Sequence, residues 1–332
     1  MPKSEDAHDV RPLTSHEQAA LPARCGDNEW YVRRREADPE PWRAEPAGLR
    51  PLPLELLKDQ SGKSVLLDAF EPEEAPDWPG GPRELRLQDD TRKLRRFSGA
   101  RVTPAVFTQI YDGESRRTFA DTGTPWARIG QISTPAFRGS GAIVGESTVL
   151  TASHVMLGGW SPSTFTPAMN GGTSLLGNGW VANIIGIAYW EKTDEQQGYD
   201  MAVCQLDLPL GRWLGYFGTA TYNDDWEDQH VWSHVGYPYD LSPRGDVPSF
   251  EGGIAVEDDD SDSYGTLEVE TRADIASGQS GGPLWSRFND GQRRIIGTLS
   301  GREDNFAEAK NSLFAGGSGM VRLVRWARDN WG

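Results

Sequence analysis

The chain has 332 residues and a formal net charge of −16. This length suits one large or two modest domains. The acidic charge disfavours binding to nucleic acids and to anionic membrane surfaces, and no apolar run approaches the roughly 18 residues that a membrane-spanning helix needs.

Residues 1–118 predict a largely irregular leader that resembles a pro-segment. Residues 1–50 are polar, charged and punctuated by prolines, a composition that buries little surface and indicates disorder or loose attachment. Residues 51–58 favour a short helix, the Pro- and Gly-rich residues 70–83 are typical of a linker, and residues 102–110 predict a strand. The basic run 91–96 indicates a solvated segment, with a cleavage or docking site as the alternative.

The N-terminus and the cysteines bear on the compartment. The residues that follow Met1 have neither the apolar core nor the cleavage-site pattern of a secretory signal. We therefore expect a cytoplasmic location, with secretion as the alternative if a leader is missing. Cys25 lies in the polar leader and Cys204 on a strand expected to be buried. We predict no bridge between them and a fold that stands without disulfides.

From residue 119 to residue 332 the pattern changes to short strands separated by turns, as expected of β-barrels. Residues 319–328 predict a last strand that runs into a short closing helix. The earlier strands are predicted at 129–132, 142–144, 148–151, 181–189, 201–206, 230–235, 266–271 and 294–300.

Three side chains in this region stand in contexts that suit nucleophilic catalysis. His154 follows two short strands, Asp200 heads a buried-looking strand, and Ser280 lies among glycines. A serine hydroxyl is a weak nucleophile and needs a base and a group that orients the base. The glycines allow a tight turn that aims the amides of Gly278 and Ser280 at one point, where an oxyanion would develop. Residues 278–283 could alternatively be a polar loop before a strand, but the three contexts together predict a hydrolase.

These residues resemble the motifs of the trypsin-like (chymotrypsin-fold) serine proteases. Residues 151–154 (Thr-Ala-Ser-His) are similar to the family's Thr-Ala-Ala-His, residues 200–203 to its Asp-Ile-Ala-Leu, and residues 278–283 to its Gly-Asp-Ser-Gly-Gly-Pro. Residues 296–301 resemble the strand that walls the specificity pocket, and residues 125–130 the entry strand of the bacterial glutamyl-endopeptidase branch. The resemblance runs from about residue 118 to the end.

The resemblance implies a mainly β fold of two six-stranded antiparallel barrels with a C-terminal helix. It also implies the roles of a catalytic triad. Ser280 would attack the scissile carbonyl, His154 would take and return the proton, and Asp200 would orient the imidazole. The amides of Gly278 and Ser280 would form the oxyanion hole, and Ser300 would hydrogen-bond to Asp200.

The chain departs from the family at three informative positions. Gly139 and Val155 stand where relatives carry a cysteine bridge beside the histidine, so both partners have been replaced together. Gln279 replaces the aspartate that pairs with a newly cut N-terminus in digestive relatives. We therefore expect no activation by that ion pair.

The residues expected in the specificity pocket point to different substrate preferences. Asp274 stands where trypsin-like enzymes carry the acid that receives Lys or Arg. The glutamyl branch places a His before the serine of the pocket wall, but here Leu299 precedes Ser300, followed by Gly301. Arg302 could restore acidic recognition, or could neutralise Asp274 and leave an apolar pocket. We expect basic residues before the scissile bond, ahead of apolar and then acidic ones.

The sequence predicts no metal site and no cofactor. The acidic residues 257–262 resemble a run of oxygen ligands for calcium, but the spacing does not match an EF-hand and a solvated loop is the simpler interpretation. The histidines are scattered, which argues against zinc.

Two functions from different classes follow. The first is a serine endopeptidase that acts on proteins or peptides through an acyl-enzyme intermediate. The second is a catalytically silent trypsin-like domain that serves as a binding or scaffold module. For residues 1–118 we expect either docking of a partner or restraint of activity, with removal near Arg116–Arg117 raising it.

Overall fold

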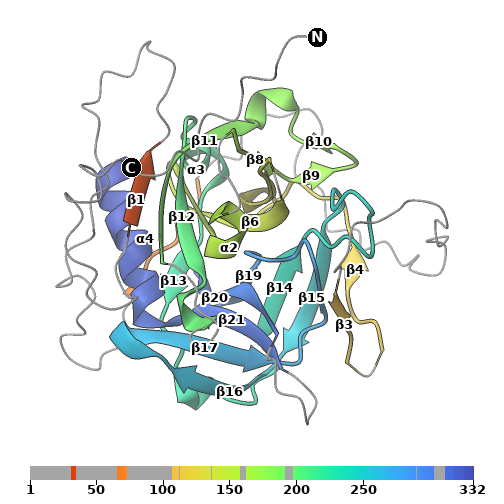
Figure 1. Ribbon diagram of the computed structural model, residues 1–332, viewed down its shortest axis with the longest axis vertical. Helices are drawn as coiled ribbons and strands as arrows, with labels where there is room; N and C mark the ends of the chain where they lie inside the picture. The colour runs from red at the N-terminus through yellow and green to blue at the C-terminus, as the bar shows by residue number, and fades with distance from the viewer. Residues whose placement is uncertain are drawn as a thin grey trace, which may run out of the picture.

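The computed structural model describes residues 31–34, 66–72, 107–111, 113–135, 137–157, 162–190, 197–288, 290–302 and 311–332. The described part is mainly β (Figure 1), with two large sheets and a long C-terminal helix. The predicted helix at 51–58, residues 73–83 of the linker predicted at 70–83, the basic run at 91–96 and Cys25 lie outside the described residues.

The first sheet closes into a six-stranded barrel. Its strands follow the order β11-β12-β7-β6-β5-β8, and pairing of β11 with β8 closes the ring. The short strand β1 (Tyr31–Arg34) adds to the outer edge of β11. The barrel encloses aliphatic side chains that are almost completely buried, such as Ile143 and Ile187. The strands are β5 (Ile129–Ser133), β6 (Arg138–Gly145), β7 (Thr148–Thr151), β8 (Thr164–Pro167), β11 (Ala182–Trp190) and β12 (Met201–Leu206).

The second sheet follows the order β16-β17-β21-β20-β19-β14-β15-β4. Only Ala255 separates β15 from β16, so one bent stretch pairs with β14 in its first half and with β17 in its second. This shared stretch joins the two sides of the sheet and gives six strands around the second barrel. The strands are β14 (Trp232–Gly236), β15 (Ser249–Ile254), β16 (Val256–Ser261), β17 (Thr266–Thr271), β19 (Pro283–Arg287), β20 (Arg293–Arg302) and β21 (Ser312–Gly316). The predicted chymotrypsin-like fold is therefore confirmed.

Short elements complete the structure. Strand β13 (Gly218–Ala220) pairs with β20 and with β2 (Leu66–Leu67). Strand β9 (Met169–Asn170) pairs with β10 (Thr173–Ser174), and β18 (Ile275–Ala276) pairs with β3 (Thr108–Gln109). The helices are α2 (Ser153–Leu157), α3 (Leu210–Leu214) and α4 (Gly317–Trp331). Single 3-10 turns span Trp126–Arg128, Asn178–Trp180, Gln197–Tyr199, Asp224–Trp226 and Ser263–Gly265.

The C-terminal helix differs from the prediction. Residues 319–328 lie wholly within α4, and the last strand, β21, ends at Gly316. Met320, Val321, Leu323, Val324 and Ala327 are all buried at the spacing of one helix face. That face packs against strands of both barrels, including β12 and β17. The helix therefore ties the two barrels together.

Other strand predictions agree closely with the structure. The strands at 148–151, 201–206 and 266–271 have the predicted bounds, and the strand predicted at 230–235 begins two residues later. Of the strand predicted at 102–110, residues 108 and 109 form β3, and residues 102–106 lie outside the described part.

Parts of the predicted leader belong to the folded body. Strand β2 (Leu66–Leu67) pairs with β13, β3 (Thr108–Gln109) with β18, and β4 (Arg117–Thr118) with β15. Phe70 bridges to Tyr216, and their rings lie 5.5 Å apart. The segments 66–71 and 107–118 therefore add to the second barrel rather than standing apart from it.

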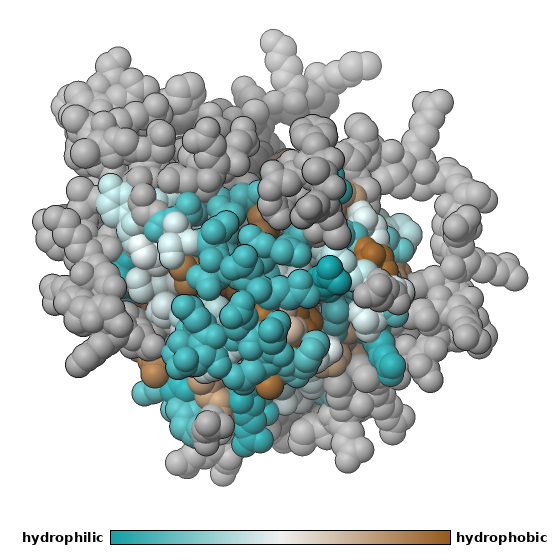
Figure 2. All heavy atoms as spheres, turned by 90° about the horizontal axis from the view of Figure 1, so that it is seen from below, coloured by the Kyte–Doolittle hydropathy of each residue, from teal (hydrophilic) through white to brown (hydrophobic). Residues whose placement is uncertain are grey.

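The acidic run 257–262 forms a strand, not the solvated loop that the sequence suggested. All but its last residue lie in β16, where Asp258 and Asp260 are exposed and Asp259 is half-buried. Neighbouring side chains on a strand point to opposite faces, which separates their carboxylates. The face below this strand is mostly hydrophilic (Figure 2). In the described part of the chain no helix is long and apolar enough to cross a membrane.

Candidate active site

The carboxylate of Asp200 organises one side of the site. Asp200 is completely buried at the start of β12, where its two oxygens accept four hydrogen bonds. Oδ2 lies 2.6 Å from His154 Nδ1 and 2.8 Å from Ser300 Oγ. Oδ1 accepts from the His154 amide at 3.0 Å and from Ser153 Oγ at 2.9 Å. Because a carboxylate only accepts hydrogen bonds, the contact of Oδ2 with the imidazole places a proton of His154 on Nδ1.

This arrangement leaves Nε2 of His154 as the basic atom of the ring. The histidine lies on α2, directly after β7. Its side chain is 39% exposed, whereas the Asp200 side chain is completely buried. A base must reach solvent or substrate, whereas the group that orients the base gains from burial. The pair therefore combines an accessible base with a buried orienting acid, as general-base catalysis requires.

Ser280 lies in a turn between β18 and β19 and is half-buried. Gly278 and Gly281 in this turn have φ values of +96° and +81°, which only glycine adopts without strain. In the described part of the chain, the amides of Gly278 and Ser280 make no hydrogen bond to another protein group. Two such donors on one turn are what an oxyanion hole requires.

Ser140, on β6, joins the serine turn to the first barrel. Its amide donates to the Ser280 carbonyl at 2.7 Å, and its hydroxyl donates to the Gly278 carbonyl at 2.9 Å. The same hydroxyl accepts from the Tyr237 amide at 2.9 Å. The carbonyls of Gly278 and Ser280 thus face β6, in the barrel that carries His154, and this contact places the serine turn beside the His–Asp pair.

A packing contact between Gly139 and Val155 stands where the family pattern has a cysteine bridge. A Cβ at Gly139 would lie 2.8 Å from the two methyl carbons of Val155 and 3.0 Å from the Ser280 carbonyl oxygen. The valine therefore packs directly over the glycine backbone. This close-packed contact helps to hold the strand and α2 together.

The residues expected to wall the specificity pocket lie on β20, next to the serine turn. The Gly281 amide donates to the Leu299 carbonyl at 2.8 Å, and the Leu299 amide donates to Gly282 at 2.9 Å. The Leu299 side chain is buried in the core of the second barrel. Ser300 is turned toward Asp200, Gly301 is buried, and Arg302 is exposed with its guanidinium 5.4 Å from the centre of the Phe107 ring.

Asp274 lies behind the turn and is tied to the segment that precedes β4. It is 1% exposed. Its Oδ1 accepts from the Tyr111 amide at 2.8 Å, and its Oδ2 accepts from the Ser115 amide at 2.7 Å and lies 2.5 Å from Ser115 Oγ. Its own amide donates to Glu251. The structure thus places Asp274 in a hydrogen-bond network with Tyr111, Ser115 and Glu251.

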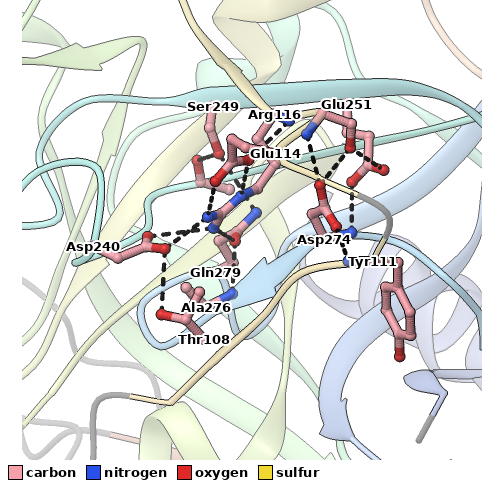
Figure 3. A network of polar contacts seen from close by, with 12 residues as sticks. Thr108, Tyr111, Glu114, Arg116, Asp240, Ser249, Glu251, Asp274, Ala276 and Gln279 are labelled. Atoms are coloured by element: carbon pink, nitrogen blue, oxygen red, sulfur yellow. Dashed lines mark hydrogen bonds and ion pairs between the residues drawn. The ribbon is translucent and has the colours of Figure 1, made fainter. Parts of the chain in front are cut away.

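Arg116 lies in the same region and is the main residue that sequence reasoning missed (Figure 3). Its buried guanidinium reaches Gln279, the residue before Ser280. Ser153 was also missed, although its replacement of alanine in the Thr-Ala-Ala-His pattern is the signal that could have revealed its bond to Asp200. Arg116 had no comparable signal, because Gln279 is 163 residues further along the chain.

Within the described residues, no cluster of three or more His, Cys, Asp or Glu side chains could hold a metal ion. Cys204 is buried and unpaired, and burial raises the pKa of its thiol. His234, on β14, is also buried, and burial lowers its pKa to about 4. Neither side chain adds to the site.

Two barrels, a buried aspartate bonded to a histidine and a serine in a turn of glycines are features of the chymotrypsin fold. The family model described as Trypsin matches residues 115–318, which is more than half of the chain. The chain therefore belongs to the trypsin family.

Individual relatives are more distant. A glutamyl endopeptidase of Bacillus licheniformis is 24% identical over 207 residues, which cover 61% of this chain and 62% of that protein. The chain thus spans less than two thirds of the length of this relative. The solved structure of a Glu endopeptidase in complex with MPD has a TM-score of 0.51 at 20% identity, covering 67% of this chain and 100% of that one. The protease Anisep from Arthrobacter nicotinovorans gives 0.47 at 20% identity, covering 65% and 100%.

Proposed function

We propose that the chain hydrolyses peptide bonds through His154, Asp200 and Ser280. The observation that carries this proposal is the Asp200 carboxylate, which is buried and accepts four hydrogen bonds, two of them from His154. This contact holds the imidazole in the tautomer whose Nε2 can take the Ser280 proton. No observation on this site favours the catalytically silent alternative.

The reaction would proceed in two halves. Ser280 Oγ attacks the scissile carbonyl while His154 Nε2 takes its proton, and the amides of Gly278 and Ser280 stabilise the oxyanion. Protonated His154 then gives its proton to the leaving amine, and the acyl group stays on Ser280. Water, deprotonated by the same histidine, releases the acid and restores the enzyme. The Asp200 carboxylate stabilises the imidazolium in both halves.

Labelling with a fluorophosphonate probe tests this proposal on the full chain. The probe forms a stable adduct only with an activated serine, so mass spectrometry should find it on Ser280. Ser280→Ala should abolish labelling, and His154→Ala should slow it strongly while both variants stay folded. A folded wild-type protein without an adduct would contradict the proposal.

We further propose that acidic residues precede the scissile bond, which reverses the preference expected from the sequence. That expectation rested on Asp274, whose carboxylate is enclosed by Tyr111 and Ser115. Arg302 at the end of β20 is an exposed cation beside the expected pocket wall. The name of the Bacillus relative, a glutamyl endopeptidase, points in the same direction.

A peptide library tests this preference. Arg302→Gln should lower kcat/KM for Glu substrates relative to Leu substrates, because the cation that receives the carboxylate is gone. Arg212→Gln is the matched control, since Arg212 is also exposed but lies on α3 and pairs with Glu146. Predominant cleavage after Lys or Arg by the wild-type protein would reject the assignment.

We also propose that the catalytic domain begins near residue 107 rather than at residue 119. The support is the pairing of β3 with β18 and of β4 with β15. Docking of a partner through the residues before 107 is a separate hypothesis. A protein that starts at residue 107 should then keep labelling of Ser280 but lose the partner. Loss of labelling in this shorter protein would mean that residues before 107 are needed for the site itself.

A further inference from the structure

One buried arginine reaches the serine turn from the segment before β4. The Arg116 side chain is completely buried, and its Nη1 donates to Gln279 Oε1 at 2.8 Å. The same Gln279 oxygen accepts from the Ala276 amide at 2.8 Å. Gln279 thus connects the start of the turn, the arginine and the residue directly before Ser280. Figure 3 shows the guanidinium between Gln279 and Asp240, with Asp274 and Glu251 alongside.

The guanidinium uses all five of its N–H donors. Nε and Nη2 each donate to one oxygen of Glu114 at 2.8 Å, which is the bidentate fork of an Arg–carboxylate pair. Nη2 also donates to Asp240 Oδ2 at 2.6 Å, and Nη1 donates to Asp240 Oδ1 at 3.3 Å. Burial lowers the pKa of Arg116, but the bonds to Glu114 and Asp240 outweigh burial and raise it. The group is therefore a permanent, fully bonded cation.

The same network fixes the turn from a second side. Asp240 follows Tyr239, whose amide donates to the Ser277 carbonyl at 2.9 Å. The amides of Gly278 and Ser280 lie on either side of Gln279 in the chain. A side chain that fixes Gln279 therefore also limits the directions in which both amides can point.

We propose that Arg116 is a positioning residue for the nucleophile turn, which it holds in the productive conformation through Gln279 in the uncut chain. In the digestive relatives an aspartate at the Gln279 position pairs with a newly cut N-terminus. Here Gln279 stands at that position and the internal cation Arg116 donates to it, so the turn is ordered without a cleavage. The proposal rests on the serine endopeptidase function proposed above. It also reverses the expectation for Arg116–Arg117: a cut there lowers activity, because it separates the cation from β4.

Kinetics of the full-length protein test the proposal. Gln279→Met removes the contact with little change in size, and Arg116→Met removes the cation. Each should lower kcat about 10²-fold, the order of loss seen when an oxyanion donor is misplaced, with KM nearly unchanged. The double variant should lose no more than the worse single variant, because both residues act through one contact. Arg117→Gln is the matched control: this neighbour is exposed and should leave kcat and KM unchanged.

Hydrogen exchange separates this inference from the function on which it rests. The amides of residues 276–280 should exchange faster in Gln279→Met than in the wild-type protein, whether or not the protein turns over substrate. Unchanged exchange, an unchanged kcat in folded Gln279→Met, or an equal loss in Arg117→Gln would each overturn the positioning role. Absence of a wild-type adduct on Ser280 would instead overturn the proposed function, and the exchange result would still decide the role of Arg116 in ordering the turn.

Discussion

Glu251 should make the stability of the protein depend on pH, in a direction opposite to that of an ordinary surface carboxylate. Glu251 lies on β15 and is 7% exposed. Burial, together with the nearby charge of Asp274, raises its pKa from 4.5 to about 7. Hydrogen bonds from Ser115 and the Asp274 amide, and attraction to Arg116, lower the pKa but do not outweigh burial. Ser115 Oγ lies 2.7 Å from Glu251 Oε1 and 2.5 Å from Asp274 Oδ2. One hydroxyl has one proton, so it can donate to only one of two carboxylates. The second contact is a hydrogen bond only if a carboxyl carries a proton.

The size and sign of the effect follow from the shift in pKa. Because the folded protein holds the proton of Glu251 more tightly than the unfolded chain, the stability that this group contributes is complete below pH 4.5. It is lost as the pH rises through about 7. The shift corresponds to about 3 kcal/mol in the free energy of unfolding. Glu251→Gln places an amide N–H where the protonated acid would donate, and it keeps an oxygen for the Asp274 amide. The Glu251→Gln variant should therefore keep this contribution to the free energy of unfolding as the pH rises.

Urea unfolding between pH 4.5 and 8 measures the difference. Both proteins should carry Ser280→Ala to prevent self-digestion. Relative to the Glu251→Gln variant, the free energy of unfolding of the parent should fall by about 3 kcal/mol from pH 4.5 to pH 8. Asp262, whose pKa burial and the charge of Glu268 raise to about 7, titrates in both proteins and cancels in the comparison. Glu257→Gln, on the exposed β16, is the control and should follow the parent. Parallel curves for the parent and Glu251→Gln would refute the reasoning.

Three further substitutions test the site. Ser280→Ala should lower kcat by about 10⁴- to 10⁶-fold, and adding His154→Ala should lower it little further, because the residues act as a unit; additive losses in turnover assays would contradict that. Ser300→Ala removes a bond to the Asp200 carboxylate and should lower kcat/KM about 10- to 100-fold, which is the worth of one hydrogen bond to a charged group; an unchanged value would show that this bond is idle. Gly281→Ala should destabilise the fold in urea by more than Gly113→Ala. Both glycines have positive φ, but only at Gly281 would a Cβ collide with β6 and β7.

The sequence predicts those parts of the fold that depend on local pattern. The strands at 148–151, 201–206 and 266–271 are short apolar or alternating runs bounded by turn residues, and pattern alone sets their limits. The last element was assigned wrongly because the glycines at 316, 317 and 319 resemble a turn inside a strand region. Tertiary packing decides there, since the apolar residues after Gly319 cover both barrels as a helix.

Some residues of the site can likewise be recognised from local sequence, whereas others can be assigned only from the structure. The motifs around His154, Asp200 and Ser280 carry their own glycines and small residues, so they can be recognised locally. Asp274 could not be placed by its position in a motif. Its carboxylate is bonded to residues 159 and 163 positions earlier in the chain. The role of a buried charge depends on which partners reach it in space, and a sequence without structure does not supply those distances.

Two of the docked parts of the N-terminal region, residues 66–71 and 107–118, limit where the chain could be cut without harm to the site. Residues 66–71 are held to the second barrel by β2, by the Asp68–Arg294 ion pair at 2.9 Å and by the pair of Glu71 with Arg293. Residues 107–118 brace the serine turn through β3, Ser115 and Arg116. A cut at Arg116–Arg117 would sever the brace itself, whereas a cut before residue 107 leaves it whole. The basic run 91–96 lies between these two segments in the chain. We therefore expect that cleavage in this run preserves activity.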